Sequence, residues 1–175
     1  MKNKNPHETK DKILDAVETY LEKNPGLSFS LEKVARLAKV SKGGLLYHYP
    51  TKENLLEALV ERMIHQFNAA VANCMSKQNL SFTWAYIETS LHPSAVRSMR
   101  SMIAVASIDE KILSSLKSEY KQWENALTAD LNDAAKSLAI RLMLDGYLLA
   151  ATGDLSKPTK DHVLKALKAF IISEK

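Results

Sequence analysis

Histidine, cysteine and paired carboxylates are the side chains best suited to catalysis or metal binding, and in this 175-residue chain they are scattered. The five histidines are His7, His48, His65, His92 and His162. No two of them have HxxxH spacing, and the single cysteine, Cys74, has no CxxC partner. No Gly-rich phosphate loop and no Ser, His and Asp cluster can be identified. The sequence therefore predicts no enzyme, no metal site and no cofactor.

The stretch SKGGLLYHYPTKENLL, residues 41–56, has a different chemical character, because lysines and aromatic residues surround two adjacent glycines. The chain has only five glycines. A glycine inside a helix costs about 1 kcal/mol relative to alanine, so the pair indicates that another molecule approaches the backbone closely. A relaxed corner between two helices would explain the pair equally well.

The charge distribution favours a nucleic acid as that molecule. Residues 28–52 contain five bases and one acid, and this excess equals the net charge of +4 of the whole chain. A local basic patch allows phosphate contacts and the release of counterions from DNA. A solvated polar face could have the same composition by chance.

The elements that would position this stretch are two short helices. Ser30 is expected to cap LEKVARLA and Ser41 to cap KGGLLYHY, with Lys39 and Val40 between the helices. Such a tight pair is a helix-turn-helix, which presents its second helix to the major groove of DNA. The residues expected to face the core are Val34, Ala35, Ala38, Val40, Leu45 and Tyr49.

Apolar residues recur with helical spacing along nearly all of the remaining chain. Helices are expected over residues 13–21, 55–75, 84–91, 96–106, 109–131, 133–151 and 159–172, with Pro25 and Gly26 ending the first. Asp109, Glu110, Asp130 and Asp133 are interpreted as caps or solvated residues. No apolar run approaches membrane-spanning length, and the polar start MKNKNPHETK is unlike a signal peptide, so a cytoplasmic protein without membrane association is expected.

The segment FSLEKVARLAKVSKGGLLYHYPTKENLLEAL resembles the DNA-binding region of the tetracycline-repressor (TetR) family of transcriptional regulators. The shared features are a capped second helix, a Val-Ser start to the third, a Gly-rich recognition helix ending in a His-aromatic pair, and Lys-Glu-x-Leu-Leu opening the fourth. The resemblance extends over about residues 9–62. It implies that the DNA-binding residues are Ser30, Lys42, Gly43, Gly44, Tyr47, His48 and Lys52.

Two positions depart from the family pattern. Lys39 replaces the usual glycine of the turn, which would place a residue with a Cβ atom at positive φ. Leu46 stands where a tyrosine is usual and Tyr47 follows it, which rotates the expected phosphate-binding hydroxyl by about 100° around the helix.

The resemblance further implies an all-α fold of about nine helices. A three-helix DNA-binding domain (residues 1–52) would precede a helical ligand-binding and dimerisation domain (residues 53–175). The segments SLAIRLMLDGYLLAATGD and HVLKALKAFII resemble the last two helices, which form a four-helix bundle in a homodimer. The expected interface residues are Leu138, Leu142, Leu149, Leu164 and Leu167. Both faces of these helices could instead be buried inside one subunit.

The predicted function is a dimeric transcriptional regulator, a repressor that a small hydrophobic effector releases from a palindromic operator in double-stranded DNA. An apolar effector pocket is expected between the DNA-binding head and the dimer bundle. The candidate residues are Met63, Phe67, Trp84, Met99, Met102, Ile103, Tyr120 and Trp123. Methionines and aromatic residues at helical spacing are also typical of a plain core. In the alternative function the C-terminal domain only dimerises or binds a protein partner, without an effector.

Overall fold

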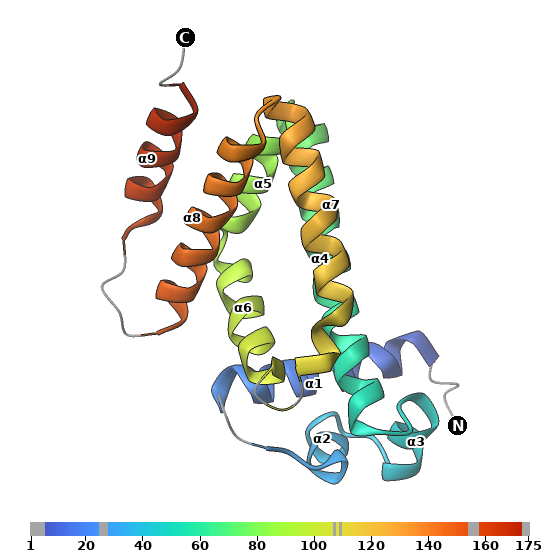
Figure 1. Ribbon diagram of the computed structural model, residues 1–175. Coiled ribbons are helices and arrows are strands. Elements are labelled where there is room, and N and C mark those ends of the chain that lie inside the picture. The colour runs from blue at the N-terminus through green and yellow to red at the C-terminus, as the bar shows by residue number, and fades with distance from the viewer. Residues whose placement is uncertain (1–5, 25–27, 107, 109, 154–157, 173–175) are drawn as a thin grey trace. The chain divides into compact units, whose positions relative to one another are not determined.

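The computed structural model describes residues 6–24, 28–106, 108, 110–153 and 158–172, and these ranges contain only helices, turns and loops (Figure 1). The α-helices are α1 (Pro6–Lys23), α2 (Leu31–Leu37), α3 (Lys42–His48), α4 (Lys52–Gln78), α5 (Phe82–Ser90), α6 (Pro93–Ala106), α7 (Ser114–Leu131), α8 (Ala134–Thr152) and α9 (Lys160–Ile172). The expected all-α class with about nine helices is confirmed. None of the helices in the described ranges is long and apolar enough to cross a membrane.

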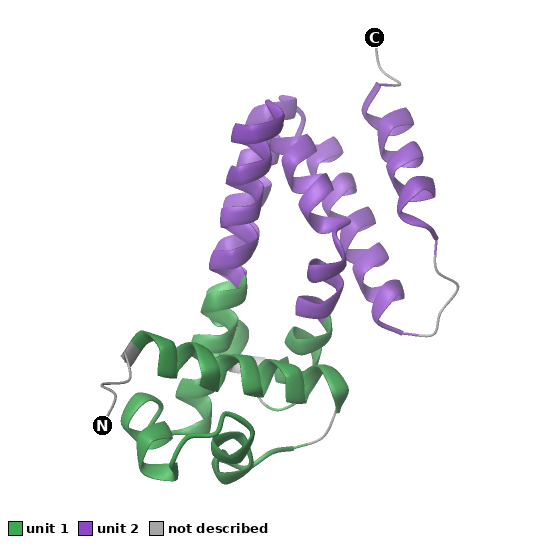
Figure 2. Ribbon diagram, turned by 180° about the vertical axis from the view of Figure 1, so that it is seen from behind, with its two compact units in different colours: residues 1–63, 100–116 green, residues 64–99, 117–175 purple. Residues whose placement is uncertain are grey.

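The chain packs as two compact units (Figure 2). Unit 1 comprises residues 1–63 and 100–116, and unit 2 comprises residues 64–99 and 117–175. These units do not follow the expected functional division after residue 52, because α4 continues without a break from unit 1 into unit 2. The C-terminal part of α6 also belongs to unit 1.

Most helix boundaries lie close to the expected ones, with two differences. The first helix, α1, begins at Pro6, well before the expected residue 13, and the second difference lies before α7. The helix expected from Asp109 begins at Ser114 instead, after a short 3-10 helix, η1 (Glu110–Leu113), in which Ile112 is buried. Asp109 lies outside the described residues, as do Pro25 and Gly26, the expected end of the first helix.

The two short helices of unit 1 form the expected helix-turn-helix. The Oγ atom of Ser30 accepts a hydrogen bond of 3.2 Å from the backbone N–H of Lys33, and Ser41 Oγ accepts one of 3.0 Å from Gly44. Each cap satisfies a backbone donor that has no partner within its helix. Five of the six residues expected to face the core are buried, and the sixth, Val40, is half-buried.

Lys39, in the turn between α2 and α3, has a φ angle of 55°. This positive φ was predicted, because Lys39 occupies the position at which the family usually has a glycine. This left-handed conformation brings Cβ close to the following carbonyl oxygen and costs roughly 1–2 kcal/mol for a residue other than glycine. Among the described residues, the other two non-glycine residues at positive φ are Asn79 and Asn132, a type that tolerates this region better.

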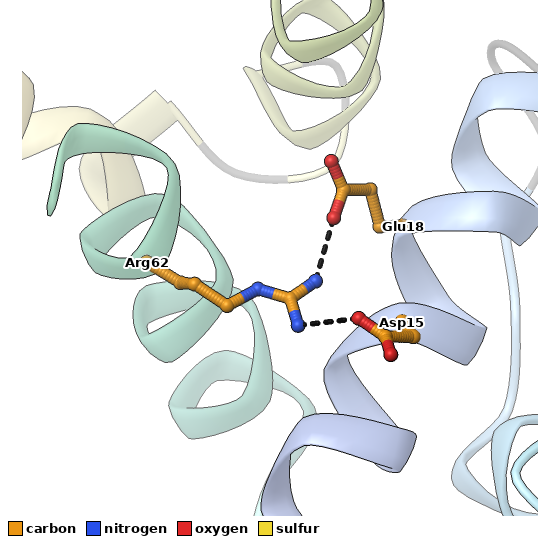
Figure 3. A network of polar contacts seen from close by, with 3 residues as sticks. All are labelled: Asp15, Glu18 and Arg62. Atoms are coloured by element: carbon orange, nitrogen blue, oxygen red, sulfur yellow. Dashed lines mark hydrogen bonds and ion pairs between the residues drawn. The ribbon is translucent and has the colours of Figure 1, made fainter. Parts of the chain in front are cut away.

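Arg62 of α4 joins α4 to α1 within unit 1 (Figure 3). Its Nη1 atom lies 2.7 Å from Oδ1 of Asp15, and its Nη2 atom lies 2.6 Å from Oε2 of Glu18. The Arg62 side chain is 13% exposed, whereas that of Asp15 is 69% exposed. The two contacts therefore lie at the edge of an apolar core to which Ile13, Val17 and Leu59 contribute.

Unit 2 is built around α5, whose Ala85, Tyr86 and Ile87 are all buried. Two carboxylates act as the caps that the sequence predicted. Asp130 Oδ2 accepts a hydrogen bond of 3.0 Å from the backbone N–H of Thr83, near the start of α5. Asp133 caps α8 by accepting one of 2.9 Å from Lys136. Because both carboxylates accept hydrogen bonds from backbone N–H groups near helix starts, their presence is explained by capping, and no catalytic role is needed.

The Arg62 contacts predict a measurable contribution to stability. Arg62→Gln should lower the free energy of unfolding by about 2 kcal/mol, because it breaks two charge-assisted hydrogen bonds and leaves two carboxylates on one face of α1. Urea unfolding followed by circular dichroism measures this change. The matched control is Glu61→Gln on the exposed face of α4, expected to cost less than about 0.5 kcal/mol. Equal losses in the two variants would show that the Arg62 contacts contribute nothing.

Candidate nucleic-acid interface

The outer surface of α3 carries the residues expected to contact DNA. Lys42 and Gly43 are exposed, Tyr47 is 83% exposed, and His48 is half-buried. The rings of Tyr47 and His48 meet edge to face with their centroids 5.1 Å apart. The opposite side of α3 is anchored by Leu45, which is completely buried. The helix therefore presents a basic, aromatic surface and is anchored from behind by a buried side chain.

The structure separates the roles of the two glycines. A Cβ atom added at Gly44 would lie 3.1 Å from the Ser41 side chain, which caps the helix through the Gly44 N–H. A Cβ atom at Gly43 would meet nothing within 4 Å. Gly44 thus has a steric role within the chain, because an added Cβ atom would crowd the capping side chain of Ser41. Packing does not explain Gly43, whose bare, exposed backbone is open to another molecule.

Lys42 forms an ion pair with Glu32 of α2. The spacing of these two residues in the sequence did not suggest this pair. Both side chains are more than half exposed. The hydrogen bond from Lys42 holds the pKa of the Glu32 carboxyl below its usual value, so Glu32 stays ionised at neutral pH. A phosphate that binds Lys42 must therefore compete with a carboxylate already in place.

Lys52, at the start of α4, lies next to the segment that precedes α2. Its Nζ atom is 4.5 Å from the centroid of the Phe29 ring and 3.4 Å from Ser28 Oγ. The buried Phe29 ring thus helps to position the ammonium group. The hydroxyl of Ser30, by contrast, already accepts a hydrogen bond as the cap of α2.

The expected effector residues are divided between the two units. Met63, Met102 and Ile103 belong to unit 1, where Met63 is buried and Ile103 is 41% exposed. The other five belong to unit 2: Phe67, Trp84, Met99, Tyr120 and Trp123.

Three of these unit 2 residues form one aromatic cluster. The ring centroid of Trp123 lies 4.9 Å from that of Phe67 and 5.3 Å from that of Tyr120. Tyr86 joins them at 5.9 Å from Trp123, and Phe82 stacks on Tyr86 at 6.0 Å. The i, i+4 spacing of Phe82 and Tyr86 in α5 is the signal that could have added them to the expected set.

A polar network borders this aromatic cluster. The Tyr120 hydroxyl donates a hydrogen bond of 3.1 Å to Asp145, and Arg141 lies 3.2 Å from the same carboxylate. Burial raises the pKa of Asp145, which the contacts with Tyr120 and Arg141 partly offset. Burial also raises the pKa of Tyr120 and Tyr86, so both phenols are neutral donors at neutral pH.

The expected dimer residues differ in exposure. Leu138, Leu142 and Leu149 of α8 are 39%, 55% and 56% exposed, and their spacing places them on one helix face. Gly146 is exposed on the same face, with nothing within 4 Å of an added Cβ atom. In α9, Leu164 is half-buried, and Leu167 is completely buried within the single chain. The surface stripe is therefore formed by α8.

Two family models match the chain. Residues 10–59 match the model described as "Bacterial regulatory proteins, tetR family". Residues 80–171 match the model described as "Tetracyclin repressor-like, C-terminal domain", which covers more than half of the chain. No curated protein matches in sequence.

Solved structures share the fold at low sequence identity. A member of the TetR family from Streptomyces coelicolor A3 is 18% identical, with a TM-score of 0.74 over 93% of this chain and 97% of that chain. A TetR-like transcriptional regulator from Rhodococcus sp. RHA1 is 16% identical, with a TM-score of 0.75 over 95% of this chain and 97% of that chain. The multidrug binding protein EbrR, solved with imidazole, is 18% identical, with a TM-score of 0.64 over 91% of this chain and 88% of that chain. With its helix-turn-helix and both family matches, the chain belongs to the TetR family of DNA-binding transcriptional regulators and is not an enzyme.

Proposed function

We propose that the protein is a cytoplasmic homodimer that binds a palindromic operator through α3 and is released from it by a small hydrophobic effector. The observation that carries this proposal is the surface of α3. Gly43 leaves bare backbone beside Lys42, Tyr47 and His48, while Leu45 anchors the helix from behind. Lysine phosphate contacts supply affinity, and side chains that reach base edges supply specificity.

The exposed stripe on α8 supports the dimer. Large apolar side chains at Leu138, Leu142 and Leu149 remain partly open to solvent in the single chain, and Ala135 and Gly146 on the same face leave room for a close helix neighbour. A symmetric pair of chains would bury this stripe against its own copy. Two reading heads would then contact two half-sites, which one recognition helix cannot do.

The aromatic cluster of unit 2 supports an effector site. Phe67, Tyr86, Tyr120 and Trp123 would surround an apolar molecule, and the Tyr120–Asp145 pair would supply one polar anchor. Phe67 lies on α4, the helix that also carries Arg62. A ligand among these rings could therefore act on the helix-turn-helix through α4. It must then bind the DNA-free state of the protein more tightly than the DNA-bound state. Tyr86 and Trp123 are only 3% and 8% exposed, which equally fits the alternative of a packed core without an effector.

The DNA-binding proposal predicts opposite effects for the two partners of the Lys42–Glu32 pair. Lys42→Ala should weaken binding to a selected palindromic duplex and relax base preference. Glu32→Gln should tighten binding about fivefold, because it releases Lys42 and removes a negative charge that faces the phosphates. Fluorescence anisotropy with selected and shuffled duplexes, over a range of salt concentrations, measures both effects.

Lys52→Ala is the matched control in the same titrations. It should weaken binding to all duplexes alike and reduce the slope of log affinity against log salt by about 1, because a phosphate contact is independent of sequence. Equal affinity of the unaltered protein for selected and shuffled duplexes at every salt concentration would contradict specific regulation.

The dimer proposal predicts that Leu149→Glu yields monomers that keep their helical content and lose operator affinity, since two buried carboxylates would meet in the interface. Light scattering gives the mass, and circular dichroism gives the helix content. Lys121→Glu on the exposed face of α7 should leave the dimer intact. An unchanged mass for Leu149→Glu would place the interface elsewhere.

The effector proposal predicts that hydrophobic compounds, neutral or weakly cationic, change tryptophan emission and weaken operator binding over the same concentration range. The variant Trp123→Phe identifies which tryptophan responds, because Trp84 is then the only tryptophan in the chain. A broad lipophilic panel that changes neither emission nor operator affinity would leave dimerisation or a protein partner as the role of the C-terminal domain.

A further inference from the structure

A groove on unit 1 lies between α1 and α2. Its volume is about 630 Å³, and its apolar lining includes Ala16, Leu37 and Ala38. Exposed lysines at positions 23, 33 and 39 also line it. No residue of α3 contributes to the groove. It is therefore a second surface of the DNA-binding unit, separate from the reading helix.

The groove has a net positive charge that the chain does not neutralise. Lys12, which also lines it, lies 2.5 Å from Glu8, and Asp15, the acid in the lining, is held by Arg62. Lys23, Lys33 and Lys39 form no ion pair with any carboxylate in the part of the chain that the structure describes. Lys23 and Lys39 thus remain available to an acidic partner, and Lys33, whose Nζ atom lies 5.8 Å from the centroid of the Tyr20 ring, adds a third positive charge.

The apolar lining narrows the identity of that partner. Leu37 is 47% exposed, whereas its neighbours Val34 and Ala35 are buried in the core. Phosphate groups gain nothing from an exposed leucine, but an amphipathic helix buries one readily. Lys39 adds a charge at a turn position where glycine would relieve the backbone, so conformation alone does not account for this lysine.

We propose that this groove binds an acidic amphipathic helix of a partner protein. The apolar side chains of that helix would pack on Leu37, Ala16 and Ala38, and its carboxylates would face Lys23, Lys33 and Lys39. Such docking combines apolar anchors with complementary charges at the edge. Because no residue of α3 lines the groove, the recognition helix itself would stay uncovered when the partner helix is bound.

The test uses the full-length protein and a fluorescein-labelled peptide of about 15 residues, long enough to form a helix, with leucines on one face and glutamates on the other. Anisotropy should show saturable binding. A scrambled peptide of the same composition should bind at least about tenfold more weakly, because its leucines no longer share a face. Equal binding of the two peptides would overturn the proposal by showing general charge attraction only.

Variants locate the site. The double variant Lys23→Glu/Lys39→Glu should lose at least about tenfold in peptide affinity, and Leu37→Gln should lose several-fold. Lys121→Glu, the same charge change on the exposed face of α7, should have no effect. All positions are exposed, and circular dichroism confirms folding. Unchanged peptide affinity in the groove variants would overturn the proposal.

Operator titrations separate this site from the DNA interface. The slope of log affinity against log salt should be the same for Leu37→Gln, for Lys23→Glu alone and for the unaltered protein, because Leu37 carries no charge and Lys23 lies outside the basic segment of residues 28–52. A flatter slope in Lys23→Glu would assign the groove to the DNA backbone and overturn the proposal. Operator binding by the unaltered protein tests the proposed regulator independently of this outcome.

Discussion

The architecture of unit 1 depends on the attachment of α4 to α1 by Arg62. The hydrophobic effect that drives apolar contacts between two helices is itself non-directional. The planar guanidinium group adds contacts of fixed direction, because its two N–H groups reach Asp15 and Glu18. The next residue, Met63, is the last of unit 1 before α4 enters unit 2. Further along the same helix, Phe67 belongs to the aromatic cluster of unit 2.

The features that could be predicted from sequence are local ones. The caps at Ser30 and Ser41, the inward side of α3 and the left-handed turn at Lys39 each depend on residues within a few positions of one another. Capping and helical periodicity are decided over such short distances. The two glycines show the limit of this reasoning. Only the packed structure shows that a Cβ atom at Gly44 would crowd the Ser41 side chain, whereas one at Gly43 would meet nothing within 4 Å.

The remaining features depend on pairs far apart in the chain. Arg62 and Asp15 are 47 positions apart, and no spacing rule connects them. Three of the residues expected to bind an effector, Phe67, Tyr120 and Trp123, meet in the aromatic cluster, whereas Trp84 has no ring contact among the described residues. The direction of each side chain depends on how α4, α5 and α7 are rotated in the unit 2 core. The complete burial of Leu167 in α9 likewise depends on its packing within one chain, which a helical stripe in the sequence does not reveal.

Gly146 has a consequence that follows from twofold symmetry. In the proposed dimer, every substitution on the exposed face of α8 occurs on both sides of the axis, and near that axis the two copies face each other. Where Gly146 meets its own copy in such a dimer, one methyl group added to the sequence would introduce two methyl groups into the interface. The energetic cost of a mutation there would therefore rise more steeply than the size of the side chain suggests. A heterodimer of one altered and one unaltered chain would have a stability between those of the two homodimers. A cell that carries both alleles would therefore contain three dimers of different stability.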